Sequence, residues 1–284
     1  MEDLWFGIAI NVVVSAVCGY GIRQWSRHWP LRWVDAAGVV LVVSLVSYIA
    51  FVWDHPWLAS WLPFSNLIVL GNGLPLFVAM LIGLTCRRLR GRPRTCTAAV
   101  VLLMATGLGA LVRPLLGQAP VCEERWDGEV CLQSTRYTCS PASATTALRR
   151  IGIRTSEAEM ARLCLTRQGT HWMGLYRGLS KKLSRDWRIE VFDAKNLETL
   201  RQASPDAPAI LTVELPRDVP TNWEYRQESG WLPGVSHSVV CLGSDGDDSW
   251  RVADPANGIE QWSTADLLVL WQGHGMRLTR RPGR

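Results

Sequence analysis

QSTRYTCSPASATTALRRIG, residues 133–152, is the stretch that decides the fold of the second half of the chain. The run Ala142–Arg150 is compatible with a helix. Pro141 suits a first helical position, because its missing N–H costs nothing there. We therefore expect a loop that delivers Cys139 onto the first turn of a helix, with Gln133 six residues ahead of it.

The role of Cys139 at this position has two interpretations. A thiol at a helix N-terminus lies at the positive end of the helix dipole, which favours thiolate over thiol. The side-chain amide of Gln133 can then point at a developing oxyanion. In the alternative interpretation, Cys139 is a small buried hydrophobic residue at a helix start. The segment alone supports both equally, and the downstream sequence decides between them.

The composition divides the chain at about residue 117. Of the 284 residues, 48% are hydrophobic, and they are concentrated in the first 117 positions. That part holds nine Arg and four acidic residues, which leaves 21 basic and 21 acidic residues in the remainder. The second part is therefore neutral and gives no support to a nucleic-acid role. We expect a membrane region over 1–117, a connector over 118–132 and one domain over 133–284.

Four apolar runs fill the first part, and each is long enough to cross roughly 30 Å of hydrocarbon as a helix. They span Leu4–Ile22, Trp33–Val52, Leu67–Thr85 and Thr97–Leu116. Asn72 and Pro75 interrupt the third run, which is tolerated where neighbouring helices cover the break. The first run follows the acidic start MEDLW rather than a basic segment, so we interpret it as a retained helix and not a cleaved signal peptide.

The arginines between the runs predict the orientation. Three lie between the first two runs and five lie between the third and fourth, whereas the loop Asp54–Asn66 has no Lys or Arg. The second cluster, within residues 87–94, is also compatible with phosphate or nucleic-acid binding. Between two spans we interpret it as a topology signal. The positive-inside rule then places both arginine loops in the cytoplasm, and the N-terminus and the peptide after residue 117 on the outer side of the cytoplasmic membrane.

Five cysteines fall on that expected outer side: Cys122, Cys131, Cys139, Cys164 and Cys241. In an oxidising compartment the two in the connector, Cys122 and Cys131, could form a disulfide. Because the number is odd, two disulfides would still leave one free thiol, and Cys139 is the natural candidate. The pairing itself stays open.

In residues 133–284 the spacing of apolar residues changes along the chain from that of helices to that of strands. Helices followed by a mostly antiparallel sheet describe an α+β domain. One expected helix begins at Ser156, and another spans His171–Leu183 with Thr170 as its N-cap. A helical turn over Asn196–Arg201 and a helix from Ser263, as its cap, to about Gln272 follow later in the chain. The expected strands are Ala209–Leu215, Val235–Gly243, Trp250–Asp254 and, after a turn at Gly273–Gly275, Met276–Thr279.

The hairpin between the second and third of these strands carries His237 and Asp254. If Gly243 opposes Trp250, these two side chains lie on one face, within diagonal reach of each other. A register slip of one residue would separate them. Taken singly, His237 is more often structural and Asp254 is a turn former. Their occurrence with a glutamine and a cysteine at a helix start favours a joint chemical role.

Three motifs of the second half of the chain resemble those of a known peptidase family. Gln133-x5-Cys139-Ser-Pro-Ala, Val235-Ser-His237-Ser-Val-Val and Val252-Ala-Asp254-Pro-Ala-Asn-Gly258 resemble the bacteriocin-processing, double-glycine leader peptidases, which are papain-like cysteine peptidases of family 39. The match covers roughly residues 130–280. Ser140 departs from the family, which usually has glycine after the cysteine. Family members known for leader removal carry this domain on the cytoplasmic side of an ABC exporter, whereas here we find no P-loop motif and expect the domain outside.

The resemblance implies thiol acyl transfer. Cys139 would be the nucleophile, His237 its proton partner and Asp254 the residue that orients the imidazole, with Gln133 in the oxyanion hole. No cofactor and no metal is implied. His171, His274, Trp172, Trp223 and Trp231 are interpreted as incidental or as groove and core residues, and the loop Pro216–Pro233 as a lid or specificity loop.

We thus expect a membrane-anchored cysteine peptidase that processes peptides or proteins outside the cytoplasmic membrane. Expected partners are a peptide or protein substrate and the lipid bilayer, without nucleic acid; a separate membrane partner or exporter stays open. The alternatives are a hydrolase of cell-wall peptides and a non-catalytic module that binds a leader peptide or partner. A transport role has little support, because Asp35 and Arg113 lie near span ends.

Overall fold

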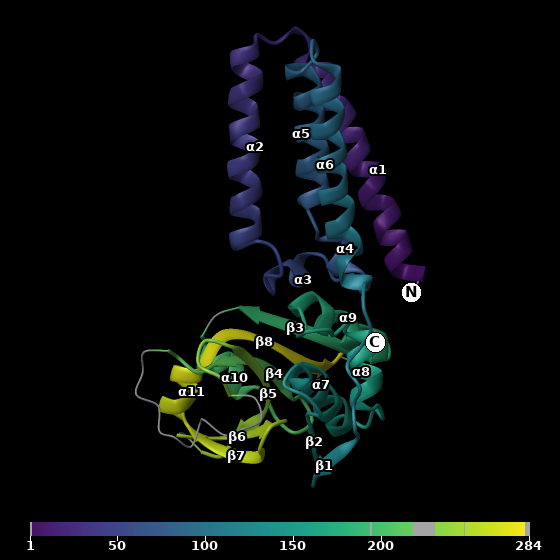
Figure 1. Cartoon of the computed structure of the whole chain (residues 1–284). Helices are drawn as coiled ribbons and strands as arrows, with labels where there is room; N and C mark the ends of the chain where they lie inside the picture. Colours follow the sequence, from purple (N-terminus) through teal and green to yellow (C-terminus); the bar gives the residue numbers. More distant parts are fainter. Residues whose placement is uncertain (1, 194, 218–230, 247, 282–284) are drawn as a thin grey trace. The chain divides into compact units, whose positions relative to one another are not determined.

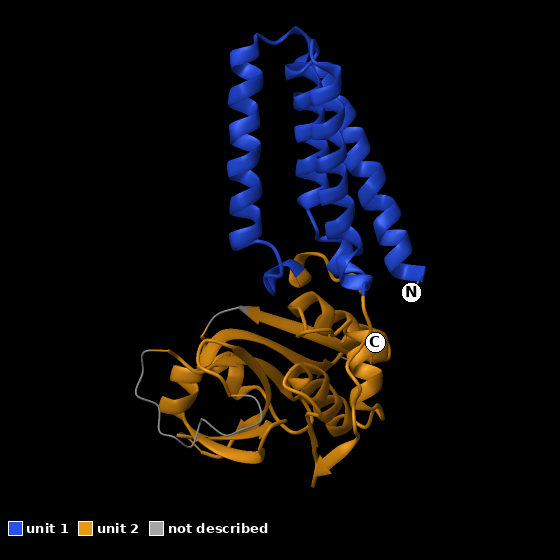
Figure 2. Cartoon of the chain, in the orientation of Figure 1, with its two compact units in different colours: residues 1–58, 66–116 blue, residues 59–65, 117–284 orange. Residues whose placement is uncertain are grey.

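The computed structural model describes residues 2–193, 195–217, 231–246 and 248–281 (Figure 1). The chain divides into two compact units (Figure 2). Unit 1 comprises residues 1–58 and 66–116, and unit 2 comprises residues 59–65 and 117–284. We describe each unit by itself.

Unit 1 consists of helices that follow the apolar runs of the sequence. They are α1 (Glu2–Trp25), α2 (Leu31–Phe51), α4 (Leu67–Leu70), α5 (Leu74–Arg88) and α6 (Pro93–Val112), with short turns η1 (Ser26–His28) and η2 (Arg113–Leu115); α3 (Trp57–Trp61) lies at the unit boundary. Within the described part of the chain, four stretches are long and apolar enough to cross a membrane, and the third consists of α4 and α5 together. This confirms the prediction of four membrane-type helices.

The third stretch is broken where the sequence places Asn72, and neighbouring helices satisfy the exposed backbone groups. Asn11 of α1 donates from Nδ2 to the carbonyl oxygens of Val69, at 3.1 Å, and Asn72, at 2.9 Å. Asn72 in turn donates to the carbonyl of Ala110 in α6, at 3.1 Å. In hydrocarbon each unsatisfied backbone group costs several kcal/mol, so these amide contacts are what make the break tolerable.

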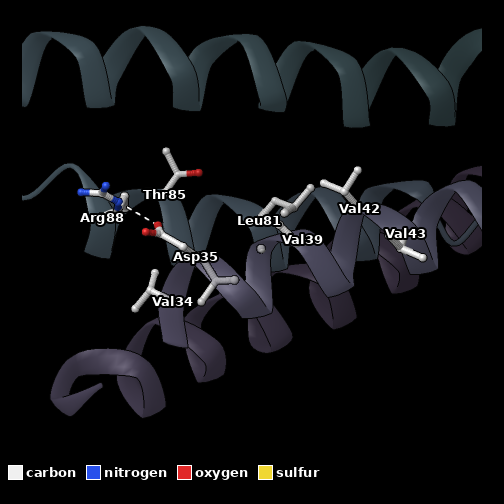
Figure 3. Close-up of a pocket in the computed structure, with 10 residues that line it drawn as sticks. Val34, Asp35, Val39, Val42, Val43, Leu81, Thr85 and Arg88 are labelled. Atoms are coloured by element: carbon white, nitrogen blue, oxygen red, sulfur yellow. Dashed lines mark hydrogen bonds and ion pairs between the residues drawn. The ribbon is translucent and has the colours of Figure 1, made fainter. Parts of the chain in front are cut away.

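Helix α2 makes polar contacts at two levels, one with α5 and one with the break between α4 and α5. Near its start, Asp35 accepts a hydrogen bond from Arg88 at 2.8 Å. Near its end, the hydroxyl of Tyr48 donates to the Gly71 carbonyl and accepts from the Gly73 N–H. A groove of about 500 Å³ lies between α2 and α5 beside the Asp35–Arg88 contact. Its lining is mainly apolar, and Val39 of α2 is among the side chains along it (Figure 3).

Unit 2 is built on one six-stranded antiparallel sheet in the order β3-β8-β4-β5-β6-β7. Its strands are β3 (Trp187–Asp193), β4 (Ala209–Glu214), β5 (Ser236–Ser244), β6 (Ser249–Asp254), β7 (Gly258–Ser263) and β8 (Trp271–Arg280); β1 (Arg125–Asp127) and β2 (Val130–Leu132) form a separate pair. The helices are α7 (Cys139–Arg150), α8 (Glu157–Leu163), α9 (Trp172–Lys182), α10 (Leu197–Arg201) and α11 (Thr264–Leu270). The predicted α+β class is confirmed.

Both faces of the central strand β5 are covered. Val239 and Cys241 belong to a core cluster that also contains Leu200 of α10 and Leu267 of α11. Ser238 and Val240, which alternate with these two residues, point to the opposite face of the sheet, where Ser238 contacts α7. A strand buried on both faces holds a fixed register, which is what a site on its first residues requires.

The hairpin register is correct at its centre, although the predicted pairing at its closed end is wrong. Val240 pairs with Ala253, as the assumed register required. Trp250, however, pairs with Ser244 rather than with Gly243, because the register shifts between Cys241 and Ser244. Gly243 has a φ of 122°, a backbone conformation that side chains with a Cβ rarely adopt, so glycine allows this irregularity.

Three predicted boundaries are also corrected. The cysteine helix begins at Cys139 itself, so Pro141 is its third residue, where it still interrupts no helical hydrogen bond. His171, and not Thr170, is the N-cap of α9. The predicted turn at Gly273–Gly275 lies inside β8, paired with β3 and β4. Strands β3 and β7 were not predicted at all.

Candidate active site

Cys139 is the first residue of α7, and a small hydrogen-bonded turn places it there. Thr138 precedes the helix; its hydroxyl donates to the Thr135 carbonyl at 2.9 Å and accepts from the Thr135 N–H at 3.0 Å. The Cys139 side chain is partly exposed, in contrast to the buried thiols of Cys164 and Cys241. The prediction that a loop delivers Cys139 onto the first turn of a helix is therefore confirmed.

Two serines of α7 fix this helix against β5. The hydroxyls of Ser140 and Ser238 lie 2.8 Å apart, and Ser143 donates to the Ser238 carbonyl at 2.9 Å. Ser238 directly follows His237 in the chain. The serine that replaces the family's usual glycine after the cysteine thus has a defined partner, and this contact brings the start of α7 to the histidine.

His237 and Asp254 form a buried pair. His237 Nε2 lies 2.7 Å from Asp254 Oδ1, and the two side chains are 2% and 0% exposed. Asp254 Oδ1 also accepts from the Ala256 N–H at 2.8 Å, while Oδ2 accepts from Trp231 Nε1 at 2.6 Å and from Asn257 Nδ2 at 3.3 Å. The turn predicted after Asp254 is therefore real, and the same carboxylate makes both the turn and the histidine contact.

The electrostatics of the three residues favour a thiolate–imidazolium pair. Burial opposes the charge on His237, yet hydrogen bonds to Asp254 and Cys139 raise the His237 pKa from 6.5 to about 10. Burial likewise opposes the Cys139 thiolate, but the hydrogen bond and charge of His237, together with the Ser238 N–H, lower the Cys139 pKa. A lowered thiol pKa is what distinguishes reactive from structural cysteines.

Gln133 lies beside the turn that carries Asp254. Its backbone N–H donates to the Pro255 carbonyl at 2.8 Å, and its own carbonyl accepts from Arg125 at 3.1 Å. The side chain is 5% exposed. The next residue, Ser134, donates its backbone N–H to the buried carboxylate of Glu157 at 2.8 Å. The glutamine is thus held at a fixed place next to the β6–β7 turn.

The remaining predicted residues fall elsewhere. His274 lies in β8, with its ring centroid 6.4 Å from that of Trp172. Trp223 and most of the predicted lid, residues 218–230, lie outside the described part of the chain. Within the described ranges, no group of three or more His, Cys, Asp and Glu is placed to hold a metal ion.

The sequence did not predict the residues that hydrogen-bond to Asp254 and to the segment after Gln133. Trp231 was interpreted only as a groove or core residue, and nothing in its local sequence signals a bond to a carboxylate 23 positions away. For Glu157 the sequence predicted only a position in the first turn of the helix that begins at Ser156. Glu157 is 0% exposed, which no helix-capping rule predicts. Each acts across elements whose contact depends on the folded sheet.

All eight cysteines are thiols in the structure. Cys122 and Cys131 both face Glu157; burial first and that carboxylate second raise their pKa values to about 11 and about 12. Neither shares the lowered pKa of Cys139.

Comparisons with known proteins identify the family of the second half of the chain. Residues 124–273, just over half of the chain, match the model of the Peptidase_C39 like family. An uncharacterized protein of Methanothermobacter marburgensis is 38% identical over 72 residues, which is 24% of this chain; the chain spans about half the length of that curated relative, 51%.

Solved structures of peptidase domains are also similar. The peptidase domain of Streptococcus ComA, a bi-functional ABC transporter, has 19% identity and a TM-score of 0.42 over 54% of this chain and 98% of that one. A double glycine motif protease from an AMS/PCAT transporter, solved with its leader peptide, has 17% identity and a TM-score of 0.38 over 58% and 100%. The assignment rests on the family model, whose matched residues include the described cysteine, histidine and aspartate. The chain belongs to the Peptidase_C39-like family.

Proposed function

We propose that this protein is a membrane-anchored cysteine peptidase that hydrolyses peptide bonds by thiol acyl transfer. The observation that carries the proposal is the contact chain from Cys139 through His237 to Asp254, in which the thiol pKa is lowered and the imidazole pKa is raised. Structural cysteines lack such a partner. The family assignment adds independent support for the same chemistry.

The reaction follows from the charges of the pair. The Cys139 thiolate attacks the scissile carbonyl carbon, and the carbonyl π electrons move to oxygen. When the C–N bond breaks, the His237 imidazolium gives its proton to the departing amine, which leaves a thioester on Cys139. His237 then removes a proton from water, the resulting hydroxide attacks the thioester, and the acid departs. The released thiolate and imidazolium restore the starting pair.

Two groups are proposed to stabilise the negative oxygen of each tetrahedral intermediate. One is the backbone N–H of Cys139 at the start of α7, and the other is the side-chain amide of Gln133. Loss of one such donor typically costs about 10²–10³ in kcat. Asp254 accepts from His237 Nε2, so it keeps the ring oriented and stabilises its positive charge.

The membrane part sets the proposed location. We assign residues 1–117 to a four-helix membrane anchor, 118–132 to a connector and 133–284 to the peptidase domain. The arginines in and beside the α1–α2 and α5–α6 connections favour a cytoplasmic position for both connections. The domain then lies on the outer side of the cytoplasmic membrane, where its substrates are peptides or proteins of that compartment.

Peptide hydrolysis by the full-length protein in lipid nanodiscs tests the proposal. The wild type is incubated with a mixed library of peptides that includes Gly-Gly sequences, and new N-termini are identified by mass spectrometry. We expect cleavage that disappears in Cys139→Ala and persists in the control Cys164→Ala. Cleavage of cell-wall muropeptides alone would assign the chemistry to that substrate class instead. Absence of both cleavages, with tight peptide binding retained, would overturn the enzyme and support a binding module.

A further inference from the structure

The side chain of Trp231 contacts both the aspartate and the histidine of the site. Its indole N–H donates to Asp254 Oδ2 at 2.6 Å. Its ring centroid lies 4.9 Å from that of His237, at an interplanar angle of 51°. The side chain is only 3% exposed. A single buried residue therefore touches both partners of the His237–Asp254 hydrogen bond.

We propose that Trp231 is a positioning residue for the Cys139–His237–Asp254 site: its indole N–H holds the Asp254 carboxylate in place, and its ring keeps water from the His237–Asp254 hydrogen bond. The inference rests on the proposed peptidase function and extends it to the residue that maintains the charged pair.

The division of donors on Asp254 gives the first argument. Oδ1 accepts from His237 and from the Ala256 N–H, so this oxygen is committed to the histidine side. Oδ2 accepts from Trp231 at 2.6 Å and from Asn257 at the longer distance of 3.3 Å. Rotation of the carboxylate would break the short bond to Trp231. The indole therefore fixes the orientation in which Oδ1 faces His237.

The charge of the donor gives the second argument. Among the described residues, His237 on β5 and Glu260 on β7 interact electrostatically with Asp254, and Cys139 on α7 interacts with His237; burial first and the Asp254 charge second raise the Glu260 pKa. An added cation at Oδ2 would compete with the imidazolium for the aspartate charge. A neutral indole donor stabilises the carboxylate and leaves its charge available to His237.

Trp231 is itself held in place. Its ring lies 5.9 Å from that of Trp262 in an edge-on arrangement, and the Trp262 indole donates to Glu260 at 2.7 Å. Just after Trp231, Pro233 forms a bridge with Leu215. The position of the indole is thus set by packing on β7 and by the segment that leads into β5. It does not depend on Asp254 alone.

Replacing Trp231 with Phe tests this role, with Trp250→Phe as the matched control. Trp250 belongs to the same core cluster and loses an equivalent indole bond, which it donates to Thr264 at 2.9 Å, away from the site. Without the Trp231 donor, Asp254 supports the His237 charge less well. The His237 pKa falls and the Cys139 pKa rises, so the pH range in which the pair is charged narrows from both ends.

Two pH profiles measure the range in which Cys139 and His237 are both charged. One is the alkylation of Cys139 by iodoacetamide, and the other is the hydrolysis of a peptide that the wild type cleaves. In Trp231→Phe we expect the alkylation midpoint to rise and the basic limit of hydrolysis to fall, each by about one pH unit, because a hydrogen bond to a charged group has roughly that worth. Trp250→Phe should lower the melting temperature and leave both pH values unchanged.

The outcomes separate this inference from the proposed function. Ordinary Cys139 reactivity in the wild type would overturn the peptidase itself. A wild-type midpoint that is low, and equal in Trp231→Phe, would overturn only the positioning role. If the variant does not fold, exchange of the Trp231 indole proton in the wild type decides by NMR. Slow exchange, with a chemical shift that titrates together with Cys139, supports the role, and rapid exchange contradicts it.

Discussion

The start of α7 and the middle of β5 each carry a cysteine, and the two thiols have opposite properties. Cys139, at the helix start, is partly exposed and has a lowered pKa because of His237. Cys241, four residues beyond His237 on β5, is fully buried in the core cluster, and burial raises its pKa to about 12. Burial opposes a thiolate in both places. Only the thiol that contacts the imidazolium overcomes it.

Cys164 shows the same behaviour as Cys241. It lies behind α9, where a Cβ on Gly178 would collide with its sulfur, and burial raises its pKa to about 12. Each pKa unit corresponds to about 1.4 kcal/mol between the two protonation states, so a thiolate at either core position is strongly disfavoured. The comparison identifies the histidine contact, and not the cysteine itself, as the origin of reactivity.

The largest expected effect comes from replacing Cys139 with alanine, compared with the same replacement at Cys241. Cys139→Ala should lower kcat for peptide hydrolysis by about 10⁴-fold or more, because no other group can form the acyl intermediate. Cys241→Ala should leave kcat within about twofold and lower the melting temperature, because it removes only a packed sulfur from the core. Comparable losses of kcat at unchanged stability would contradict the assignment.

Removing the imidazole should convert Cys139 into an ordinary thiol. In His237→Gln we expect the pH midpoint of Cys139 alkylation to rise to at least that of an unperturbed thiol, about 8.5, because burial still opposes the thiolate. We expect kcat to fall by about 10³-fold or more. In the wild type, hydrolysis should decline on the basic side only as the His237 imidazolium deprotonates near its pKa of about 10. His274→Gln, in β8, is the control and should change neither profile.

Gln133→Ala should separate transition-state stabilisation from thiol activation. We expect kcat to fall by about 10²–10³-fold, as for the loss of one oxyanion donor, while the alkylation midpoint of Cys139 stays that of the wild type. The reason is that Gln133 is not among the groups that lower the Cys139 pKa. A shift of the midpoint together with kcat would mean that the glutamine supports the ion pair instead.

A smaller effect is expected from Glu157, which holds the residue after Gln133. Its buried carboxylate accepts from both the backbone N–H and the hydroxyl of Ser134. Glu157→Gln should lower the free energy of unfolding by about 1–3 kcal/mol, because an amide can satisfy only part of these donors. Glu159→Gln is the matched control: its side chain is 42% exposed and pairs with Lys182, so we expect about 0–1 kcal/mol. Equal losses in urea unfolding would contradict the holding role of Glu157.

The sequence was sufficient where local patterns decide structure. The apolar runs predicted the membrane-type helices, and alternation with a turn signal predicted β5 and β6. Ser263 was recognised as the cap of α11, which a reciprocal capping box confirms. The register that brings His237 to Asp254 was also predicted, because it depends on the centre of the hairpin and not on its closed end.

Local patterns failed where partners distant in the sequence decide. The strand β3 pairs with β8 over residues more than 80 positions apart. Its first five residues, WRIEV, alternate apolar and polar side chains, a strand signal that the prediction did not use. The glycines of β8 indicate a turn by composition, yet Gly275 is paired in the sheet and lies under the ring of Phe192. The contact of Trp231 with Asp254 is of the same kind, because it exists only once β5 and β6 are joined.

The most direct test is the reactivity of each cysteine of the wild-type protein as a function of pH. Limiting iodoacetamide is applied to the full chain in lipid nanodiscs, and each thiol is quantified by mass spectrometry, with Cys164 and Cys241 as internal references. Our account predicts selective alkylation of Cys139 well below pH 8, with Cys164 and Cys241 unreactive throughout that range. Alkylation of Cys139 with the midpoint of an ordinary thiol, or its recovery in a disulfide, would contradict the thiolate–imidazolium pair and with it the peptidase.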